Sequence, residues 1–176
     1  MHKEITNNNL IKCCGCGAEV RDFNGPRHQY IGSDAGCWEV FCEVLAKEYL
    51  HYNELWQSHR LTVDTYAAQH PGVESRKSTQ SVYIHLTRLY LQLERGIAGK
   101  AANDFMKKVS TYKNEFRWLE APDFSGTMNI LDIAKAKNMD EHKQLVEKWA
   151  EDVWNAWSAY HSEIKAFAEK VISNRK

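Results

Sequence analysis

The sequence has no excess of charge of either sign. Its 176 residues include 23 Lys and Arg and 23 Asp and Glu, so the formal net charge is zero. Nucleic acids and anionic membrane surfaces both attract proteins that carry an excess of positive charge. We therefore expect neither nucleic acid nor a membrane surface among the partners of this protein.

Long apolar runs are absent as well. No run approaches the roughly 20 residues that a membrane-spanning helix requires, and residues 1–12 lack the apolar core of a signal peptide. The expected location is therefore the cytoplasm. The sequence also has no internal repeat, no glycine-rich loop of a nucleotide-binding protein and no nucleophile elbow.

The composition that remains is that of a packed globule. Hydrophobic residues make up 43% of the chain, and six Trp, eight Tyr and six Phe provide large side chains for a core. The length suits one domain, or one domain with a small appendage. Five Cys are present, four of them before position 38. In a reducing compartment, clustered Cys are more often metal ligands or free thiols than disulfides.

Cys13 and Cys16 have the spacing of a zinc knuckle. Two Cys three positions apart can direct both sulfurs at one ion, and Gly17 permits the tight turn in which backbone N–H groups face those sulfurs. Cys14 is the odd member and is expected to point away, and a Cys14–Cys16 pair is the weaker chelate. Cys incidental to a loop are the alternative interpretation.

Apolar residues recur at steps of three and four along most of the chain, which predicts a mostly α fold. Helices are expected over residues 35–52, 59–69, 79–95, 101–112 and 131–137, and as one long helix over 140–173. The predicted architecture is a bundle of five or six helices (residues 35–176) with a small irregular N-terminal element like a zinc knuckle (residues 1–34) docked on it. The N-terminal element would include a hairpin over 20–23 and 29–31, and residues 53–58 would form a connection.

The first predicted helix carries a third candidate ligand. Cys37 lies in its first turn, where free N–H groups and the helix dipole favour a thiolate. A knuckle, a hairpin and a Cys at a helix start resemble treble-clef zinc sites. The position that normally gives that helix a second ligand is Val40, so the fourth ligand is expected elsewhere. Cys42 is interpreted as a small core residue, and Glu48 falls off the apolar face.

His70 is the preferred fourth ligand. Pro71 follows it and biases it away from helical backbone angles, so its side chain can leave the helical face. His28 and His85 are the alternatives. The first hypothesis is thus a structural zinc ion held by three thiolates and one imidazole. The predicted ligands are Cys13, Cys16, Cys37 and His70.

The second hypothesis is a metal-dependent enzyme or small-ligand site between helices. Asp64, His70 and His85, with His59 or His161, would line a cavity that leaves a metal position open. In the alternative interpretation, Asp64, Gln69 and His85 form a buried hydrogen-bond network that fixes helix packing. A catalytic triad of Ser81, His85 and Asp64 is disfavoured, because Ser and His on adjacent turns of one helix rarely reach attack geometry.

The third hypothesis is a protein-interaction module. Cysteine knuckles often serve as docking platforms, and the last predicted helix is amphipathic. An exposed apolar stripe would favour a homodimer.

Several motifs together resemble an uncharacterised bacterial family, a domain of unknown function, over most of the chain. The family pattern is a Cys-Pro-Gly-Cys-Gly start, Tyr-Ile-Gly before Cys-Trp, a Leu-Thr-Val-Asp-Ala-Tyr-Ala-x-Gln-His-Pro-Gly centre, Gln-Ser-Val-x-x-His-Leu, and Trp-Ala-x-x-Val-Trp-x-Ala-Trp. These motifs fall at 13–17, 30–32, 37–38, 61–72, 80–86 and 149–157. Cys14 replaces the usual Pro, and Thr65 replaces Ala. The resemblance implies a shared fold and shared candidate ligands, and it implies no reaction.

Overall fold

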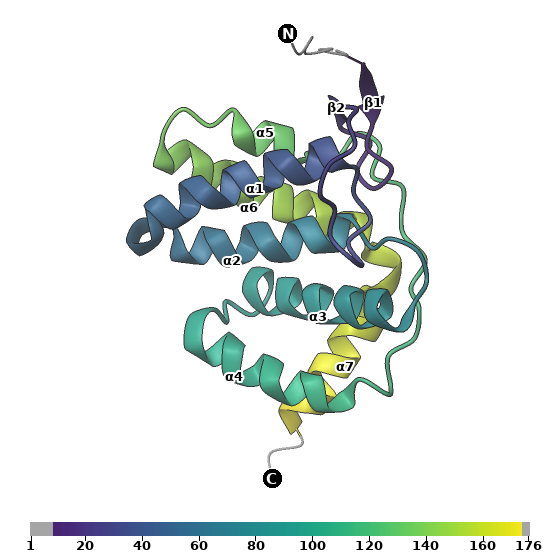
Figure 1. Cartoon of the computed structure of the whole chain (residues 1–176). Coiled ribbons are helices and arrows are strands. Elements are labelled where there is room, and N and C mark those ends of the chain that lie inside the picture. Colours follow the sequence, from purple (N-terminus) through teal and green to yellow (C-terminus); the bar gives the residue numbers. More distant parts are fainter. Residues whose placement is uncertain (1–8, 174–176) are drawn as a thin grey trace, which may run out of the picture.

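The computed structural model of the chain describes residues 9–173. In this range it has seven α-helices and a two-stranded antiparallel sheet (Figure 1). In chain order the elements are β1 (Leu10–Lys12), β2 (Glu19–Arg21), α1 (Ala35–Leu50), α2 (Tyr52–Gln69), α3 (Arg76–Leu93), α4 (Gly99–Val109), α5 (Ile130–Ala134), α6 (Met139–Ala156) and α7 (His161–Ser173). Two 3₁₀ turns, η1 (Ser110–Tyr112) and η2 (Ser158–Tyr160), follow α4 and α6. The mostly α bundle predicted from the sequence is confirmed.

Helix α2 is the centre of the bundle and packs against α1, α3 and α6. Helices α1, α2, α5 and α6 lie together in the upper part of Figure 1, and α3, α4 and α7 lie below them. The small sheet lies beside the first turns of α1. Because α2 has neighbours on several sides, even its polar residues Thr62, Asp64 and Gln69 are buried.

Two tryptophans fix the C-terminal end of α2. Trp149 and Trp157 are fully buried in the core. The indole N–H of Trp149 donates to Oε1 of Gln69 at 3.0 Å, and that of Trp157 donates to the carbonyl of Ala68 at 3.1 Å. The Gln69 amide in turn donates to the carbonyl of Met128. Hydrogen bonds with α6 and with the loop before α5 therefore fix the end of α2.

The single long helix predicted over residues 140–173 is wrong. Helix α6 ends at Ala156, and η2 separates it from α7, which turns away to pack on α3 and α4 (Figure 1). Neither Pro nor Gly lies at the break, so the sequence carries no local mark of it. The break occurs where the indole of Trp157 bonds to α2, and it lets the chain follow the lower half of the bundle.

The predicted connection over residues 53–58 is also wrong, because α2 already begins at Tyr52. This stretch is polar because most of it is the solvent face of the helix, while Leu55 is buried beneath it. Helix α3 likewise begins three residues before the predicted start, where Ser75 caps it by accepting a hydrogen bond from the Ser78 N–H at 3.1 Å.

The hairpin expected over residues 20–23 and 29–31 is wrong in its partner strand. Strand β2 pairs with β1, with Val20 opposite Ile11, so the hairpin closes around residues 13–17, the predicted knuckle, for which the short name knuckle is kept. Residues 29–31 form no strand. The turn at residues 13–17, between β1 and β2, therefore reverses the chain, and the segment between residues 23 and 29 does not.

Each helix between residues 9 and 173 is either too short or too polar to span a lipid bilayer. Residues 1–8 of the predicted N-terminal element, which spans 1–34, lie outside the described residues.

Candidate metal centre

Three cysteines and one histidine meet at one point between the small sheet and the helices. Their ligand atoms all lie within 4.8 Å of one another, and each residue is buried, with exposed fractions of 0–4%. The four residues, here named the Cys3His cluster, are Cys13, Cys16, Cys37 and His70. They come from the knuckle, the first turn of α1 and the end of α2, so the cluster joins three parts of the chain.

The knuckle is a tight turn between β1 and β2. The N–H of Cys13 donates to the carbonyl of Ala18, and the N–H of Gly17 donates to the carbonyl of Cys13, both at 2.8 Å. Gly17 has a φ of +72°, a backbone angle that favours glycine. This conformation places the sulfurs of Cys13 and Cys16 on the same inner side of the turn.

Helix α1 brings Cys37 to the knuckle because its first turn touches strand β2. A Cβ atom on Gly36 would lie 2.3 Å from the carbonyl oxygen of Arg21, so only glycine permits this approach. The sulfur of Cys37 then lies 3.9 Å from that of Cys16. The Tyr66 hydroxyl also donates a hydrogen bond to Cys37 Sγ at 3.4 Å, a contact that no pattern in the sequence predicts.

His70 closes the cluster from the end of α2. Its Nδ1–H donates to the carbonyl of Tyr66 at 2.8 Å, which fixes the tautomer and directs Nε2 at the thiols. Nε2 lies 3.5 Å from Cys37 Sγ. The ring fits against the knuckle because residue 15 is glycine: a Cβ there would meet the His70 ring at 2.4 Å.

The spacing of these atoms suits a tetrahedral ion. With zinc–sulfur bonds of about 2.3 Å and a zinc–nitrogen bond of about 2.05 Å, tetrahedral angles place two sulfurs about 3.8 Å apart and a sulfur and a nitrogen about 3.6 Å apart. The separations of 3.9 Å for Cys16–Cys37 and 3.5 Å for Cys37–His70 are close to both values. The donor set therefore needs little movement to accept zinc.

The three thiols strongly affect one another's ionisation. Hydrogen bonds from Cys16 and Cys37 lower the pKa of Cys13 far below its usual range. The hydrogen bond with Cys13 raises the pKa of Cys16 to about 12, and hydrogen bonds with Cys13 and Cys16 also raise the pKa of Cys37 above its usual range. The three sulfurs are therefore close enough for the charge of each to affect the others. Three thiolates at this distance require a cation between them.

Cys14 lies outside the Cys3His cluster, as expected for the odd member of the knuckle. Cys14 as a whole is exposed, but its thiol is partly buried. This burial, together with the charge of Asp34, raises the pKa of the thiol to about 11. Its sulfur does lie within 4.8 Å of Cys13 and of the Asp34 carboxylate. The prediction that Cys42 is a small core residue is wrong, because Cys42 is exposed on α1 beside a shallow groove that Trp38 also lines.

The other histidines considered for this site lie elsewhere. The His28 ring packs against Tyr30 and Trp38, with centroids 4.4 and 5.2 Å apart. His85 hydrogen-bonds to Asp64, and His161 stacks on Trp154 at 3.9 Å. Within residues 9–173, Asp64, His70 and His85 do not come together as a group that could hold one ion.

A carboxylate at the other end of α1 is buried, which the sequence does not predict. Glu48 was placed off the apolar face, yet it is fully buried. Its carboxylate accepts hydrogen bonds from Nδ1 of His59 at 2.9 Å, from Nε2 of His142 at 2.7 Å and from the Thr62 hydroxyl at 2.6 Å. Only the approach of α2 and α6 reveals this network, because nothing near Glu48 in the sequence marks it.

Comparison with known proteins identifies a family. The model of a family described as a family of unknown function (DUF5946) matches residues 11–158, which includes the whole Cys3His cluster. No curated protein and no solved structure matches the chain.

Proposed function

The chain belongs to this family of unknown function (DUF5946), and we propose that its Cys3His cluster binds one zinc ion with a structural role. Three thiolates and one imidazole in tetrahedral arrangement are an ordinary zinc ligand set. The ion would tie the N-terminal segment, residues 9–34, to α1 and α2.

The observation that carries this proposal is the closure of the cluster. All four residues are at most 4% exposed, and four protein ligands complete a tetrahedron. A catalytic zinc needs an open coordination position for water or substrate. The surroundings of the cluster instead support a fixed geometry. The Tyr66 hydroxyl donates a hydrogen bond to Cys37 Sγ, and the Tyr66 carbonyl accepts one from Nδ1–H of His70.

A structural ion would also stabilise the N-terminal segment, which has few stabilising contacts of its own. Its sheet has two strands of three residues each, and an isolated hairpin of this size is not stable in water. The segment buries few large apolar side chains apart from Val20. A zinc ion bound only by the folded state would stabilise the docking of this segment by its binding free energy.

Metal analysis of protein purified under reducing conditions without chelators tests the proposal. We expect about one zinc per chain, as one complete ligand set implies, and loss of most of it in Cys16→Ser. Cys42→Ser, which changes an exposed cysteine on α1, is the matched control and should retain the ion. A wild-type protein free of zinc, or equal zinc in both variants, would contradict the proposal.

Limited proteolysis tests the structural role separately. Chelation should expose Lys12 and Arg21 to trypsin while the helical circular dichroism is retained, because the ion holds the segment and not the bundle. If chelation left the cleavage pattern unchanged although zinc was removed, the ion would have another role.

A further inference from the structure

Besides Glu48, a second carboxylate is buried, that of Asp64. It lies between α2 and α3, apart from the Cys3His cluster. The Asp64 side chain is 4% exposed. Its Oδ1 accepts a hydrogen bond from Nδ1 of His85 at 2.8 Å, and its Oδ2 accepts one from the Gln92 amide at 2.9 Å. The guanidinium of Arg88 forms an ion pair with the same carboxylate, with Nε 3.1 Å from Oδ2. Three side chains of α3, spaced three and four residues apart, thus hold Asp64 in place.

This arrangement decides which nitrogen of His85 is available. An aspartate carboxylate at neutral pH only accepts hydrogen bonds, so Nδ1 of His85 carries a hydrogen and faces inward. Nε2 then points away from Asp64, and no group within the described part of the chain hydrogen-bonds to it. The His85 side chain is 20% exposed, so Nε2 can meet a ligand from solvent.

The space in front of His85 is a surface cavity of about 360 Å³. It is bounded by α3, by Tyr30 from the loop before α1, and by the segment that follows η1. The lining residues are Tyr30, Lys77, Gln80, Ser81, Ile84, His85 and Lys113. All of them lie in the described range, and none is acidic.

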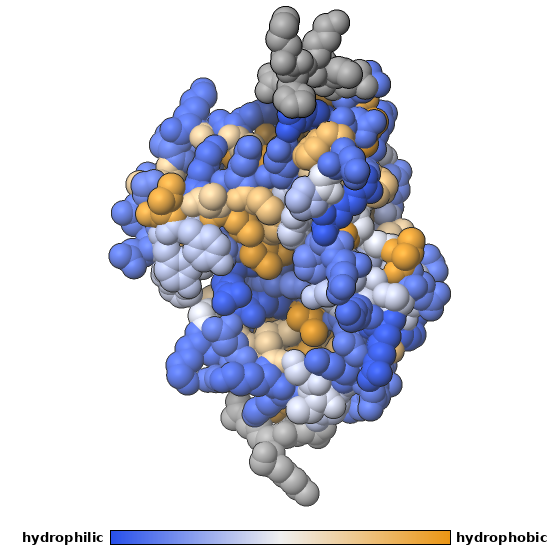
Figure 2. Space-filling model, in the orientation of Figure 1, coloured by the Kyte–Doolittle hydropathy of each residue, from blue (hydrophilic) through white to orange (hydrophobic). Residues whose placement is uncertain are grey.

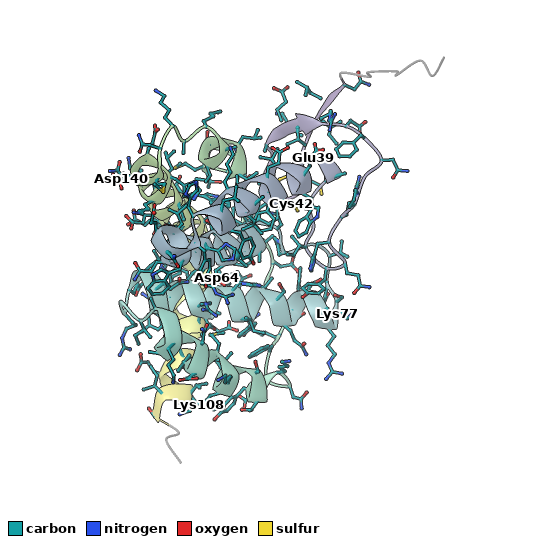
Figure 3. All side chains as sticks on the ribbon, turned by 60° about the vertical axis from the view of Figure 1, so that its left-hand side comes forward. Glu39, Cys42, Asp64, Lys77, Lys108 and Asp140 are labelled. Atoms are coloured by element: carbon teal, nitrogen blue, oxygen red, sulfur yellow. The ribbon has the colours of Figure 1, made fainter. Side chains whose placement is uncertain are left out.

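The charged groups of the cavity come from two separate elements. Lys77 projects from the first turn of α3 at the edge of the molecule, whereas Asp64 lies inside, where α2 and α3 overlap (Figure 3). Lys113 comes from the segment after η1. The negative charge of Asp64 is shielded behind His85 and paired with Arg88, so the cavity presents positive charge and hydrogen-bond donors.

We propose that this cavity binds the oxyanion group of a small molecule, a phosphate or a carboxylate. Lys77 and Lys113 provide the charge, and Nε2 of His85, the ring nitrogen that Asp64 leaves free, is the third contact to the ligand. Gln80 and Ser81 add uncharged donors at the cavity wall. The site is separate from the Cys3His cluster, but Tyr30 at its wall belongs to the N-terminal segment that the proposed ion would hold in place.

Titration with inorganic phosphate, followed by NMR of the zinc-containing protein as purified, tests the proposal. Added phosphate at constant ionic strength should shift the ring resonances of His85 saturably, and the double variant Lys77→Gln, Lys113→Gln should bind about tenfold more weakly, since each exposed ion pair contributes modestly. Lys148→Gln, which removes an exposed charge from α6, is the control and should bind as the wild type does.

A parallel titration with acetate separates the two sources of oxyanion. Stronger saturable binding of acetate than of phosphate at His85 would assign the cavity to carboxylates, and the reverse would assign it to phosphates. The proposal is overturned if neither anion gives a saturable shift up to about 50 mM, well above millimolar affinity. It is also overturned if the double variant binds as tightly as Lys148→Gln. Because the lysines are exposed, their replacement leaves the fold intact.

Discussion

At the scale of single residues, the Cys3His cluster depends on one glycine that binds nothing. Gly15 lies between the two knuckle cysteines, and a side chain there would collide with the His70 ring and with the carbonyl of Gly32 at 2.6 Å. The carbonyl of His70 also accepts a hydrogen bond from the Gly32 N–H at 3.0 Å. The knuckle, the 30–32 segment and the end of α2 therefore meet with no room for an extra atom.

Gly15→Ala should both destabilise the protein and weaken metal retention. Forcing a methyl group into this contact costs about 1–3 kcal/mol and displaces His70 from the thiols. Denaturant unfolding and zinc analysis of the variant measure the two effects. In the control Gly126→Ala the new methyl meets open space at a φ of +84°, so strain of about 1 kcal/mol is expected with zinc unchanged. Equal zinc loss in both variants would contradict the role given to Gly15.

The residues of the cluster differ in how far the sequence could reveal them. Cys13 and Cys16 carry a spacing with a direct chemical meaning, and Pro71 marks the freedom of His70. The parts played by Gly15 and Tyr66 could not be predicted, because they arise where segments distant in the sequence touch. A local pattern contains no information on such contacts.

At the scale of elements, α1, α2 and α6 are joined by the buried Glu48 network. Burial on its own would raise the pKa of Glu48, but the hydrogen bonds from His142, His59 and Thr62 outweigh it and lower the pKa. A carboxylate whose folded-state pKa lies below its unfolded value contributes stability above the unfolded value, and that contribution is lost as the pH falls through the folded value.

Glu48→Gln should therefore destabilise the protein in a pH-dependent manner. At neutral pH, removing the charge from its buried partners should cost about 3–5 kcal/mol. The difference from wild type should shrink below about pH 4, as the wild-type carboxylate becomes protonated. Thermal unfolding from pH 3 to 7 measures it, with the exposed Glu147→Gln on α6 as the control. A difference that did not change with pH would show that packing, and not charge, holds the network.

The elements themselves were predictable where apolar periodicity was strong and unbroken. Helices α1, α3 and α4 lie close to their predicted ranges because each has one buried stripe. The prediction for residues 53–58 is wrong because most of these side chains face solvent. The prediction of one helix over 140–173 is wrong because the contact of Trp157 with α2, which lies far away in the sequence, causes the break between α6 and α7. The predicted pairing of residues 20–23 with 29–31 is wrong because the chain reverses at the knuckle, before β2, and not after it.

At the scale of the whole molecule, one face carries apolar residues that the bundle does not cover. Figure 2 shows hydrophobic colour in a band along α1, toward the end where α1 passes into α2. The exposed large side chains at that end are Tyr49, Leu50, Tyr52 and Trp56. The sequence places the apolar stripe of the predicted homodimer on the last helix, but Ile164, Ala168 and Val171 of α7 are buried in the bundle, so a homodimer would depend on this exposed surface instead.

Leu50→Glu tests the homodimer at this surface. The Leu50 side chain is 81% exposed, so a charge there leaves the fold intact but opposes an apolar interface. Sedimentation should give twice the mass of one chain for the wild type and the mass of one chain for the variant. Val73→Glu, which alters a side chain 82% exposed beyond the end of α2, should remain a dimer. A wild type that sediments as a monomer at all concentrations would contradict the prediction.

The division of the chain into residues 1–34 and 35–176 stays a prediction, and the proposed ion gives it a physical meaning. If zinc ties the N-terminal segment to the bundle, the two parts form one unit only while the ligand set is complete. The account therefore depends most on the ligands of the ion.

X-ray absorption at the zinc edge of the purified protein measures that ligand set directly. The account predicts three sulfurs at about 2.3 Å and one nitrogen at about 2.0–2.1 Å, with no oxygen ligand. Cys16→Ser should lose this spectrum, whereas Cys42→Ser should keep it. A spectrum with a bound water, or with fewer than three sulfurs, would contradict a closed structural site made by Cys13, Cys16, Cys37 and His70.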